Sequence, residues 1–449
     1  MKQNPPYNIE LLSPAALRPY PGNPRTHSSK QIKQIARSIE QFGFTNPVLI
    51  SDINEIIAGH GRVEAAKILD LQAVPTVRLA HLSPAQRRAY VLADNKLALN
   101  AGWDREMLAI ELQALVDLDF SMDAIGFELA EVDIVLEEAH EANARATAED
   151  QLPEVQLHRP VSRVDDLWQL GSHRLLCANS MEQAAYVTLL GDELAEMVFT
   201  DPPYNVPIDG HVCGLGSVRH REFAMASGEM TETEYTKFLV TVLGLMAQAS
   251  GNGALHFVCM DWRHLFEALT AGRNVHGNLK NLVVWNKDNG GMGSFYRSKH
   301  ELVLIWKHGT APHINNIELG RHGRNRTNVW DYPGANTLRS CWPKEVGLHP
   351  TIKPTAMVAD ALMDASSRNG IVLDPFAGSG TILIAAEKTG RHGRAIEIDP
   401  LYVDVAIRRW QTFTGKLAVL HSTLETFEEI ERKRHGCAPP ESILQPETR

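Results

Sequence analysis

GIVLDPFAGSGTILIAAEKTG, residues 370–390, has the pattern of a strand, a glycine turn and a helix, and it decides the fold. Gly378 and Gly380 let the backbone pass close beneath a ligand, because no Cβ stands in the way. Thr381 begins the predicted helix, so backbone N–H groups and the positive end of the helix dipole face the same ligand.

The glycine turn lacks the G-x-G-x-x-G spacing of a pyrophosphate cradle. A cofactor that has a ribose and no phosphate, such as S-adenosylmethionine, fits it better. RAIEID, residues 394–399, is the next predicted strand, and Glu397 near its end can bind ribose hydroxyls. Asp374, at the end of the preceding strand, can engage the ammonium group of the cofactor or cap the loop.

Residues 151–449 alternate strand-like and helix-like segments, which predicts an α/β fold with a doubly wound sheet covered by helices on both faces. Ligands of such sheets lie outside the carboxyl ends of the strands. The stretch 207–345 is rich in Gly, Asn, His and Arg and is poorly periodic, so we expect an insertion outside the core. The predicted strands are 173–177, 196–200, 254–259, 282–286, 301–306, 370–374, 394–399 and 417–420.

Two further segments precede this domain. Residues 1–95 predict a small α+β unit, and residues 96–150 predict an acidic helical connector that ends in a flexible linker. The net charge of −10 has its origin in this connector, because Asp104 to Asp150 holds 14 acidic residues and only two arginines. The stretch 273–326 is basic, so the net charge does not exclude a polyanionic partner.

Composition excludes several classes of protein. The 449 residues are 44% hydrophobic and 22% charged, which is typical of globular domains. No run of about 18 apolar residues occurs, and the N-terminus has no signal-peptide core, so we expect no membrane segment. Five scattered cysteines without a CxxC pair argue against a disulfide scaffold and a zinc knuckle. We therefore expect a cytoplasmic protein that requires no metal.

EMVFTDPPYNV, residues 196–206, places Asp-Pro-Pro-Tyr directly after an apolar strand. Pro202 and Pro203 fix the turn and remove two N–H donors, so carbonyl oxygens remain as acceptors. Asp201 adds a carboxylate, and Tyr204 adds a flat ring on which a base can stack. Such a site can accept hydrogen bonds from the exocyclic amine of a base, which localises the nitrogen lone pair as it attacks a methyl group. The target nucleotide would have to leave the duplex.

Residues 170–425 resemble the amino-specific DNA methyltransferases in which the DPPY motif precedes the cofactor motif, the β-type order. The resemblance implies a methyltransferase sheet, S-adenosylmethionine as methyl donor, and N6 of adenine or N4 of cytosine as acceptor. Asp as the first residue of the motif favours adenine, since Ser there would favour cytosine. The matching stretches are LLCANS (175–180), DPPYNV (201–206), ELVLIWKHG (301–309), HPTIKP (349–354), DPFAGSGT (374–381) and EIDPLYVDVAIRRW (397–410).

The resemblance also implies roles for individual residues. The base would be held by Asp201, Pro202, Pro203 and Tyr204. The cofactor would be held by Asp374, Phe376, Gly378, Ser379, Gly380, Thr381 and Glu397, with Lys353 and Thr351 closing over its methionine end. Asn179 departs from the family, which has Gly-Asp where this chain has Ala178-Asn179, but its amide oxygen can still accept a hydrogen bond from the adenine amine.

The stretch 207–345 would then hold the target-recognition region, and double-stranded DNA would be the partner. Interleaved aromatic residues accompany its cations, and we expect Trp285 and Trp306 among them to be core. The RHGRNR cluster at 321–326 favours a functional role, because bunched cations repel one another without a partner. The candidates for contacts to phosphate or guanine are Arg297, Lys299, Arg321, Arg324 and Arg326.

The order of elements in residues 8–95, with the turn GHGR at 59–62, resembles the ParB-like N-terminal domain. In that family the turn engages nucleotide phosphates or DNA, so Arg62 at a helix start is a candidate contact. His60 stands where the family has a glutamate, which argues against nucleotide hydrolysis. Docking of DNA is the favoured interpretation of this domain.

Other readings of the sequence stay open. They are an N4-cytosine DNA methyltransferase, a ParB-like DNA-binding regulator with a decayed methyltransferase module, and a nuclease that uses the N-terminal unit. The intact DPPY motif and glycine turn argue against decay, and residues 1–95 show no clear carboxylate cluster for a metal. An RNA or a protein glutamine could also fit the amine site, although the basic stretch favours duplex DNA. A homodimer and a restriction-modification context are compatible with the sequence.

Overall fold

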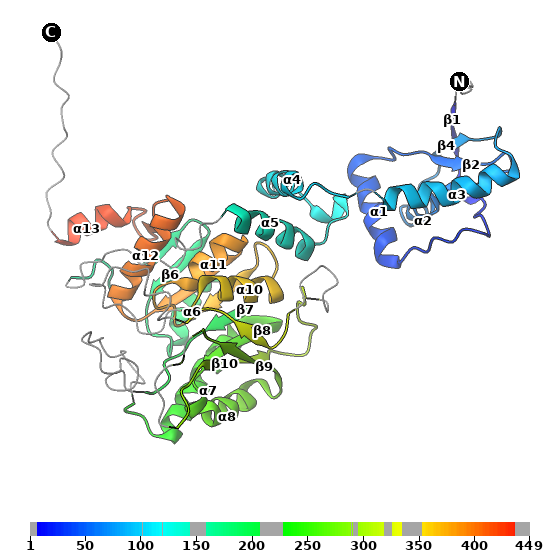
Figure 1. Cartoon of the computed structure of the whole chain (residues 1–449). Helices are drawn as coiled ribbons and strands as arrows, with labels where there is room; N and C mark the ends of the chain where they lie inside the picture. The colour runs from blue at the N-terminus through cyan, green and yellow to red at the C-terminus, as the bar shows by residue number, and fades with distance from the viewer. Residues whose placement is uncertain are drawn as a thin grey trace, which may run out of the picture. The chain divides into compact units, whose positions relative to one another are not determined.

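The computed structural model describes residues 7–100, 102–118, 120–143, 159–206, 228–288, 290, 295–317, 326–334 and 353–435. The chain divides into two compact units, Met1–Ala144 and Arg145–Arg449 (Figure 1). Each unit contains buried hydrophobic clusters of its own.

The first unit begins with a four-stranded sheet in the order β1-β4-β2-β3. Helix α1 begins where the Ser28 side chain accepts the Gln31 N–H at 3.1 Å, and it ends at Gly43, whose φ of 78° favours glycine. The elements are β1 (Ile9–Leu12), η1 (Pro14–Ala16), α1 (Ser29–Phe42), β2 (Val48–Ile50), β3 (Ile56–Ala58), α2 (His60–Ile68), β4 (Val74–Arg78) and α3 (Pro84–Leu99).

The acidic segment that follows is a cluster of short helices with a small core of its own. The helices are α4 (Arg105–Asp117), η2 (Met122–Ile125) and α5 (Leu129–Asn143). Leu112, Met122 and Val132 are buried between them, and Lys30 on α1 pairs with Glu128 at 2.8 Å. The cluster therefore packs against α1 within the first compact unit. The predicted flexible linker is the polar tract 140–150; its first residues belong to α5, and residues 144–150 lie outside the described residues.

The second unit is built on a ten-stranded sheet in the order β11-β9-β10-β8-β7-β12-β13-β6-β5-β14. The five central strands, from β8 to β6 in this order, run parallel, whereas β10 and β5 run antiparallel to their neighbours β8 and β6. The strands are β5 (Leu167–Leu170), β6 (His173–Cys177), β7 (Ala195–Thr200), β8 (Ser250–Met260), β9 (Leu279–Asn286), β10 (His300–Lys307), β11 (Val329–Asp331), β12 (Ile371–Asp374), β13 (His392–Glu397) and β14 (Val419–Leu420).

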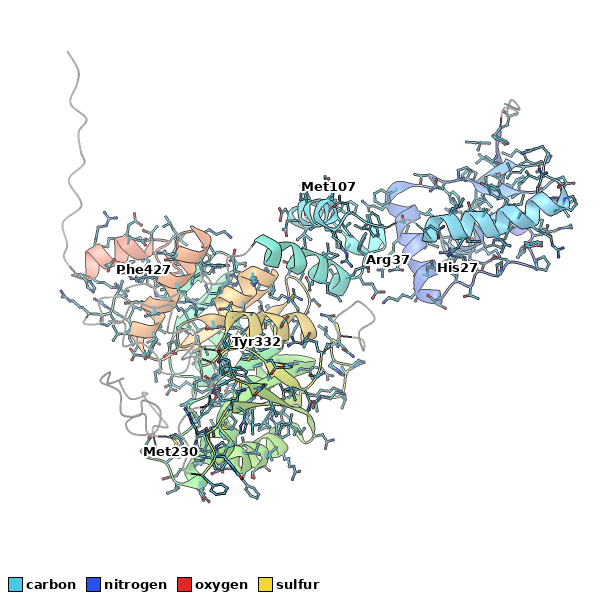
Figure 2. All side chains as sticks on the ribbon, viewed as in Figure 1. His27, Arg37, Met107, Met230, Tyr332 and Phe427 are labelled. Atoms are coloured by element: carbon cyan, nitrogen blue, oxygen red, sulfur yellow. The ribbon has the colours of Figure 1, made fainter. Side chains whose placement is uncertain are left out.

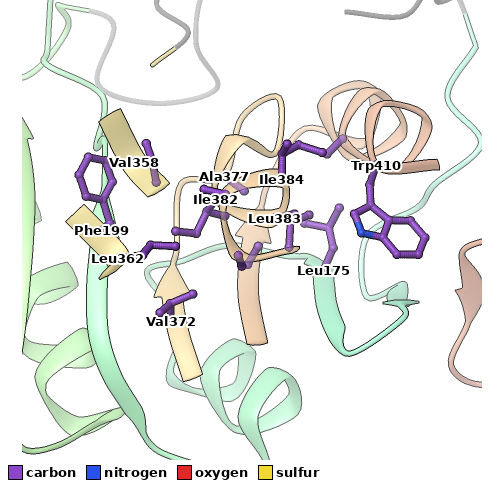
Figure 3. Close-up of a cluster of buried hydrophobic side chains, with 14 of the residues drawn as sticks. Leu175, Phe199, Val358, Leu362, Val372, Ala377, Ile382, Leu383, Ile384 and Trp410 are labelled. Carbon is purple, nitrogen blue, oxygen red and sulfur yellow. The ribbon is translucent and has the colours of Figure 1, made fainter. Parts of the chain in front are cut away.

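Helices cover both faces of this sheet, as predicted. Phe199 of β7 lies in the cluster that packs against α10, α11 and α12 (Figure 3). The preceding residue, Val198, points to the opposite face and lies in the cluster that packs against α6, α7 and α8. The helices of this unit are α6 (Gln183–Leu190), α7 (Glu232–Gln248), η3 (Trp262–His264), α8 (Leu265–His276), α10 (Thr355–Ala365), α11 (Thr381–Thr389), α12 (Pro400–Thr414) and α13 (Phe427–His435). None of the helices in the described part of the chain has both the length and the apolar character needed to cross a membrane.

The prediction of an insertion across 207–345 is wrong for most of its described part. Strand β8 pairs with β7 in the middle of the sheet, and β10 and β9 extend the sheet outward. Trp285 on β9 and Trp306 on β10 are 2% and 0% exposed, so both are core residues, as expected. Loops rich in Gly and His alternate with these elements and hide their periodicity when the whole stretch is averaged. The parts outside the described residues are 207–227, 289, 291–294, 318–325 and 335–345.

The strand order reverses between β7 and β12. From β7 the chain continues through α7 to β8 on one side, and from β12 it continues through α11 to β13 on the other. Loops that leave two adjacent parallel strands in opposite directions open a crevice at the carboxyl ends of those strands. The DPPY turn follows β7 and the glycine turn follows β12, so both motifs flank this position.

Candidate active site

A hydrogen bond joins the two motifs at their strand ends. The Thr200 hydroxyl, on the last residue of β7, donates to Asp374 Oδ1, on the last residue of β12, at 2.8 Å. The two strands are paired in parallel register just before this point, with Leu373 opposite Val198. Asp201 is therefore only one residue away from a direct link to the cofactor motif.

The glycine turn has the geometry that the sequence predicted. Gly378 and Gly380 have φ values of 50° and 77°, and α11 begins directly after them at Thr381. The Gly378 N–H donates to Glu397 Oε2 at 2.8 Å, which holds the turn against the end of β13. A Cβ on Gly380 would lie 2.7 Å from the Cβ of Ala406 on α12, so this position needs glycine for space as well as for conformation.

Two buried carboxyl groups flank the turn. Burial raises the pKa of Asp374 to about 7, although the Thr200 hydroxyl and the Phe376 N–H stabilise its charged form. Burial likewise raises the pKa of Glu397 to about 7, against the stabilising N–H groups of Asp399 and Gly378. Each carboxylate keeps further lone pairs for a ligand, because an ionised carboxyl has about four acceptor sites.

Arg409 of α12 lies buried beneath the glycine turn. Its guanidinium donates to the Ser379 hydroxyl at 3.2 Å, to Thr381 Oγ1 at 3.0 Å and to Thr355 Oγ1 at 3.0 Å. The predicted cofactor residues Ser379 and Thr381 are therefore fixed from below by one cation. Arg409 was not among the predicted site residues, and its position next to Ile407 and Trp410 in a mostly apolar stretch of α12 was the available signal.

The structure places only some of the remaining predicted cofactor residues near the glycine turn. The Ala178 N–H donates to the Glu397 carbonyl at 3.0 Å, which places the loop of Asn179 beside the end of β13. Asn179 itself uses Oδ1 to accept the Met181 N–H at 3.0 Å. Phe376 packs near Phe238 of α7, with ring centroids 6.1 Å apart. Thr351 lies outside the described residues.

The DPPY turn is held by hydrogen bonds from both sides. Tyr204 donates its hydroxyl proton to Asp201 Oδ1. Tyr235 of α7 donates to the Pro203 carbonyl at 2.8 Å, so of the two proline carbonyls this one is engaged within the fold. Asn205 accepts the N–H groups of Gly228 and Met230, both at 3.1 Å, and so ties the end of the turn to the start of the α7 segment.

Lys353 lies between two carboxylates in this site, rather than alone at the cofactor. Its Nζ donates to Asp201 Oδ2 at 2.5 Å and lies 3.0 Å from Glu301 Oε2. Glu301 also pairs with Lys287, and the Tyr204 hydroxyl lies 3.3 Å from Glu301 Oε2. Two ammonium groups thus balance two carboxylates at the carboxyl edge of the sheet.

Burial and charge pull in opposite directions within this group, which we call the Asp201–Lys353–Glu301 network. Burial raises the pKa of Asp201 above its ordinary value, and the Lys353 ammonium opposes that rise. Burial alone would also raise the pKa of Glu301, but Lys353 and Lys287 outweigh it and lower that pKa to about 2. The pKa of Lys353 is raised, because its two carboxylate partners outweigh the cost of burial. Lys353 therefore stays charged, and Glu301 stays ionised beside it.

Glu301 and Lys287 were not among the predicted site residues. Glu301 opens the apolar strand ELVLIW and is only 8% exposed, so a carboxylate at the start of a buried strand was the signal to notice. Lys287 directly follows β9 and lies over the Trp285 ring, 4.6 Å from its centroid. The ion pair between Lys287 and Glu301 could not be predicted from the sequence, because it depends on the register in which β9 and β10 pair.

The candidate DNA contacts divide into three groups. Arg297 and Lys299 are exposed between β9 and β10. The prediction that Arg326 contacts DNA is wrong. Arg326 pairs with Asp360 at 2.6 Å and Asp364 at 3.1 Å, beside Tyr332 (labelled in Figure 2), so it stabilises α10 from inside the fold. Arg321 and Arg324 lie outside the described residues.

In the first unit, Arg62 lines a cavity of about 270 Å³ together with Arg25, His27 (labelled in Figure 2) and His60. Arg62 donates to the Asn46 carbonyl at 2.8 Å. Burial lowers the pKa of His60, which accepts the Tyr20 N–H at 3.3 Å. A contact between Arg62 and DNA stays a prediction.

The second unit thus combines an acceptor-rich turn with a glycine turn at neighbouring strand ends. The acceptors of the DPPY turn suit an amine, and the two acidic groups at the glycine turn suit hydroxyl or ammonium donors. No group of His, Cys, Asp or Glu side chains in the described ranges could hold a metal ion. The geometry therefore suits transfer of a small group to an amine between two organic ligands.

Comparison with known proteins matches three families along the chain. Residues 2–96 match the ParB N-terminal domain, residues 106–164 the ParB-methyltransferase HTH domain, and residues 195–408 the N6/N4 type of DNA methylase. The three matches follow one another without overlap.

Individual relatives match separate parts of the chain. The ParB-like nuclease domain-containing protein YnaK of Escherichia coli K12 is 53% identical over 72 residues, which cover 16% of this chain and 83% of that protein. The type II methyltransferase M2.MboI of Moraxella bovis is 24% identical over 239 residues, which cover 50% of this chain and 84% of that protein. Among solved structures, the cytosine-N4-specific PvuII DNA methyltransferase is similar at 16% identity with a TM-score of 0.40, covering 61% of this chain and 93% of that one.

Proposed function

We propose that the chain is an amino-specific DNA methyltransferase of the N6/N4 type with a ParB-like N-terminal domain, and that it methylates N6 of adenine in double-stranded DNA. The observation that carries the proposal is the Thr200–Asp374 bond of 2.8 Å, which joins the DPPY turn to the cofactor turn. A methyl donor over one turn and a base amine at the other would then be neighbours.

S-adenosylmethionine is the proposed methyl donor, and the hydrogen-bond acceptors around the glycine turn fit it. Glu397 can accept hydrogen bonds from ribose hydroxyls, and Asp374 can accept them from the ammonium of the methionine end. The Phe376 ring and the Asn179 loop border the same strand ends. When bound, the sulfonium supplies a methyl group that a neutral amine can attack.

The base site would work through acceptors that this chain already orients. Asp201 and the Pro202 carbonyl accept hydrogen bonds from the two amine protons and localise the lone pair on nitrogen. As the N–C bond forms and the methyl group leaves its donor, one amine proton would pass to Asp201, the carboxylate beside it, whose pKa is raised by burial. Lys353 donates to Asp201 Oδ2 at 2.5 Å in the structure, so the base amine would have to displace it from that oxygen, and Glu301 at 3.0 Å is the carboxylate that would keep it. Tyr204 offers its ring to the base that has left the duplex.

The choice of adenine rests on the aspartate that opens the motif. Expression in a host without DNA methylation, followed by mass spectrometry of the nucleosides and methylation-sensitive sequencing, tests it. The expected product is N6-methyladenine at one sequence motif, and N4-methylcytosine would establish the alternative acceptor instead. Substitution Asp201→Asn should lower the rate about 100-fold or more, while S-adenosylmethionine still binds. Full activity of that variant would refute the role given to Asp201.

A further inference from the structure

Two aromatic rings stand in solvent at the turn between β9 and β10. Phe295 and Tyr296 are 86% and 81% exposed, and their ring centroids lie 4.4 Å apart in an edge-to-face arrangement. Large apolar side chains grouped in this way are unfavourable in water and mark an interaction site. We call the two residues the aromatic tip.

The stem of the same hairpin is part of the base site. Lys287 directly follows β9 and pairs with Glu301, the second residue of β10. Glu301 lies 3.0 Å from Lys353, which in turn donates to Asp201 at 2.5 Å. The aromatic tip therefore projects from the edge of the sheet where the target base would enter.

The surroundings of the aromatic tip are positively charged. Arg297 and Lys299 are exposed on the hairpin itself. Trp262, 49% exposed, donates its indole N–H to Ser298 at 3.2 Å, and Arg263 lies over its ring, 5.1 Å from the centroid.

The nearby acidic groups are engaged within the fold. Asp261 pairs with Arg263 at 3.1 Å, and Asp288 accepts the Gly334 N–H at 2.8 Å. The described residues of the loop between Lys287 and His300 carry two cations, Arg297 and Lys299, against one carboxylate, Asp288. This positive balance matches a polyanion that also offers flat apolar surfaces, and a stacked DNA duplex has both properties.

We propose that the aromatic tip enters the duplex and fills the gap that the target base leaves when it rotates into the site beside Asp201. This inference rests on the proposed function, since it concerns the same site and the same substrate. Removing a base from the stack is costly, and an inserted ring restores the lost stacking contacts. Within the described part of the chain, the ring contact that Phe295 and Tyr296 make is the one between them, so packing inside the fold does not account for their position.

The test compares a paired and a mispaired substrate. Wild type and Phe295→Ala/Tyr296→Ala receive a duplex with the target adenine opposite thymine, and the same duplex with the adenine opposite an abasic site. Because the unpaired base is already easy to extrude, the variant should lose about tenfold or more in kcat/KM on the paired duplex and less than about threefold on the other. Phe413→Ala, an exposed aromatic on α12, is the control and should leave both rates unchanged.

A spectroscopic measurement separates insertion from simple contact. With 2-aminopurine in place of the target adenine, wild type should raise its emission on binding, and the double variant should raise it much less at saturating protein. Tyr296→Phe, which keeps the ring, should behave as wild type.

Three results would overturn the inference. The first is an equal loss of kcat/KM on both duplexes, and the second is no loss on the paired duplex. The third is a wild-type protein that is a dimer and a double variant that is a monomer, which would make the aromatic tip a contact between copies of this chain. Wild type that methylates neither duplex would instead refute the proposed function itself, and the inference with it.

Discussion

Replacing Lys353 by Met removes one charge from a buried network and leaves its shape nearly intact. Lys353 is 5% exposed on its side chain and holds Asp201 at 2.5 Å and Glu301 at 3.0 Å. Without it, two carboxylates face each other with Lys287 as the remaining cation. Removing one partner of a buried ion pair costs about 3–5 kcal/mol, so we expect the free energy of unfolding to fall by that amount near pH 7.5.

The loss should depend on pH in a definite direction. In the variant the pKa of Asp201 in the folded state lies further above its value in the unfolded state, since burial already raises it and Lys353 no longer opposes the rise. Between those two pKa values the folded state binds more protons than the unfolded state, so stability increases as the pH falls. The deficit should therefore shrink towards pH 5.5, by up to about 1.4 kcal/mol for each pH unit.

Urea unfolding followed by tryptophan fluorescence measures this, because seven of the eight tryptophans belong to the unit Arg145–Arg449. Lys416→Met is the matched control: Lys416 is 58% exposed and pairs with Glu387 at 2.7 Å on the surface. A surface pair contributes about 0–1 kcal/mol, so the control should be nearly silent at both pH values. A deficit for Lys353→Met below about 1 kcal/mol, or one that grows as the pH falls, would refute the reasoning.

Two further predictions concern the cofactor turn and the distant end of the sheet. Gly380→Ala should weaken binding of S-adenosylmethionine in calorimetry about tenfold or more, because the added Cβ would lie 2.7 Å from the Cβ of Ala406. Gly415 is the matched control, since it has a similar φ of 70° but open space around it, and Gly415→Ala should bind the cofactor normally. Equal effects of the two substitutions would count against the clash. His276 is half-buried, neither of its ring nitrogens has a partner in the described residues, and burial with the nearby His308 lowers its pKa to about 4. The unfolded state then binds more protons than the folded state below about pH 6.5, so thermal stability should fall from there towards pH 4. His276→Asn should flatten this dependence, and an unchanged profile would contradict the role of His276.

The sequence was sufficient for the parts of the site that lie in continuous motifs. The glycine turn and the DPPY turn each follow an apolar strand, and alternation of strands and helices predicts that both turns lie at the carboxyl edge of one sheet. Ser28, Gly43 and Ser83 mark helix ends in the first unit by local hydrogen bonds, and such signals depend on near neighbours alone.

The rest depends on pairs of residues far apart in the chain. Glu301 meets Lys353 only because β10 reaches the same edge as the segment before α10, and no local pattern encodes that meeting. Arg326 was predicted to need an outside partner because its cationic neighbours are close in sequence. Asp360 and Asp364, on successive turns of α10, supply that partner from within the fold.

Asn205 ties together two segments that lie more than 20 residues apart in the sequence. Its amide accepts the N–H groups of Gly228 and Met230 at 3.1 Å and donates to the Met230 carbonyl at 2.8 Å, so residues 206 and 228 emerge side by side. One side chain therefore fixes the end of the DPPY turn to the start of the α7 segment. A substitution at Asn205 would leave these backbone groups without their partner and loosen the base site without removing any group that contacts the base.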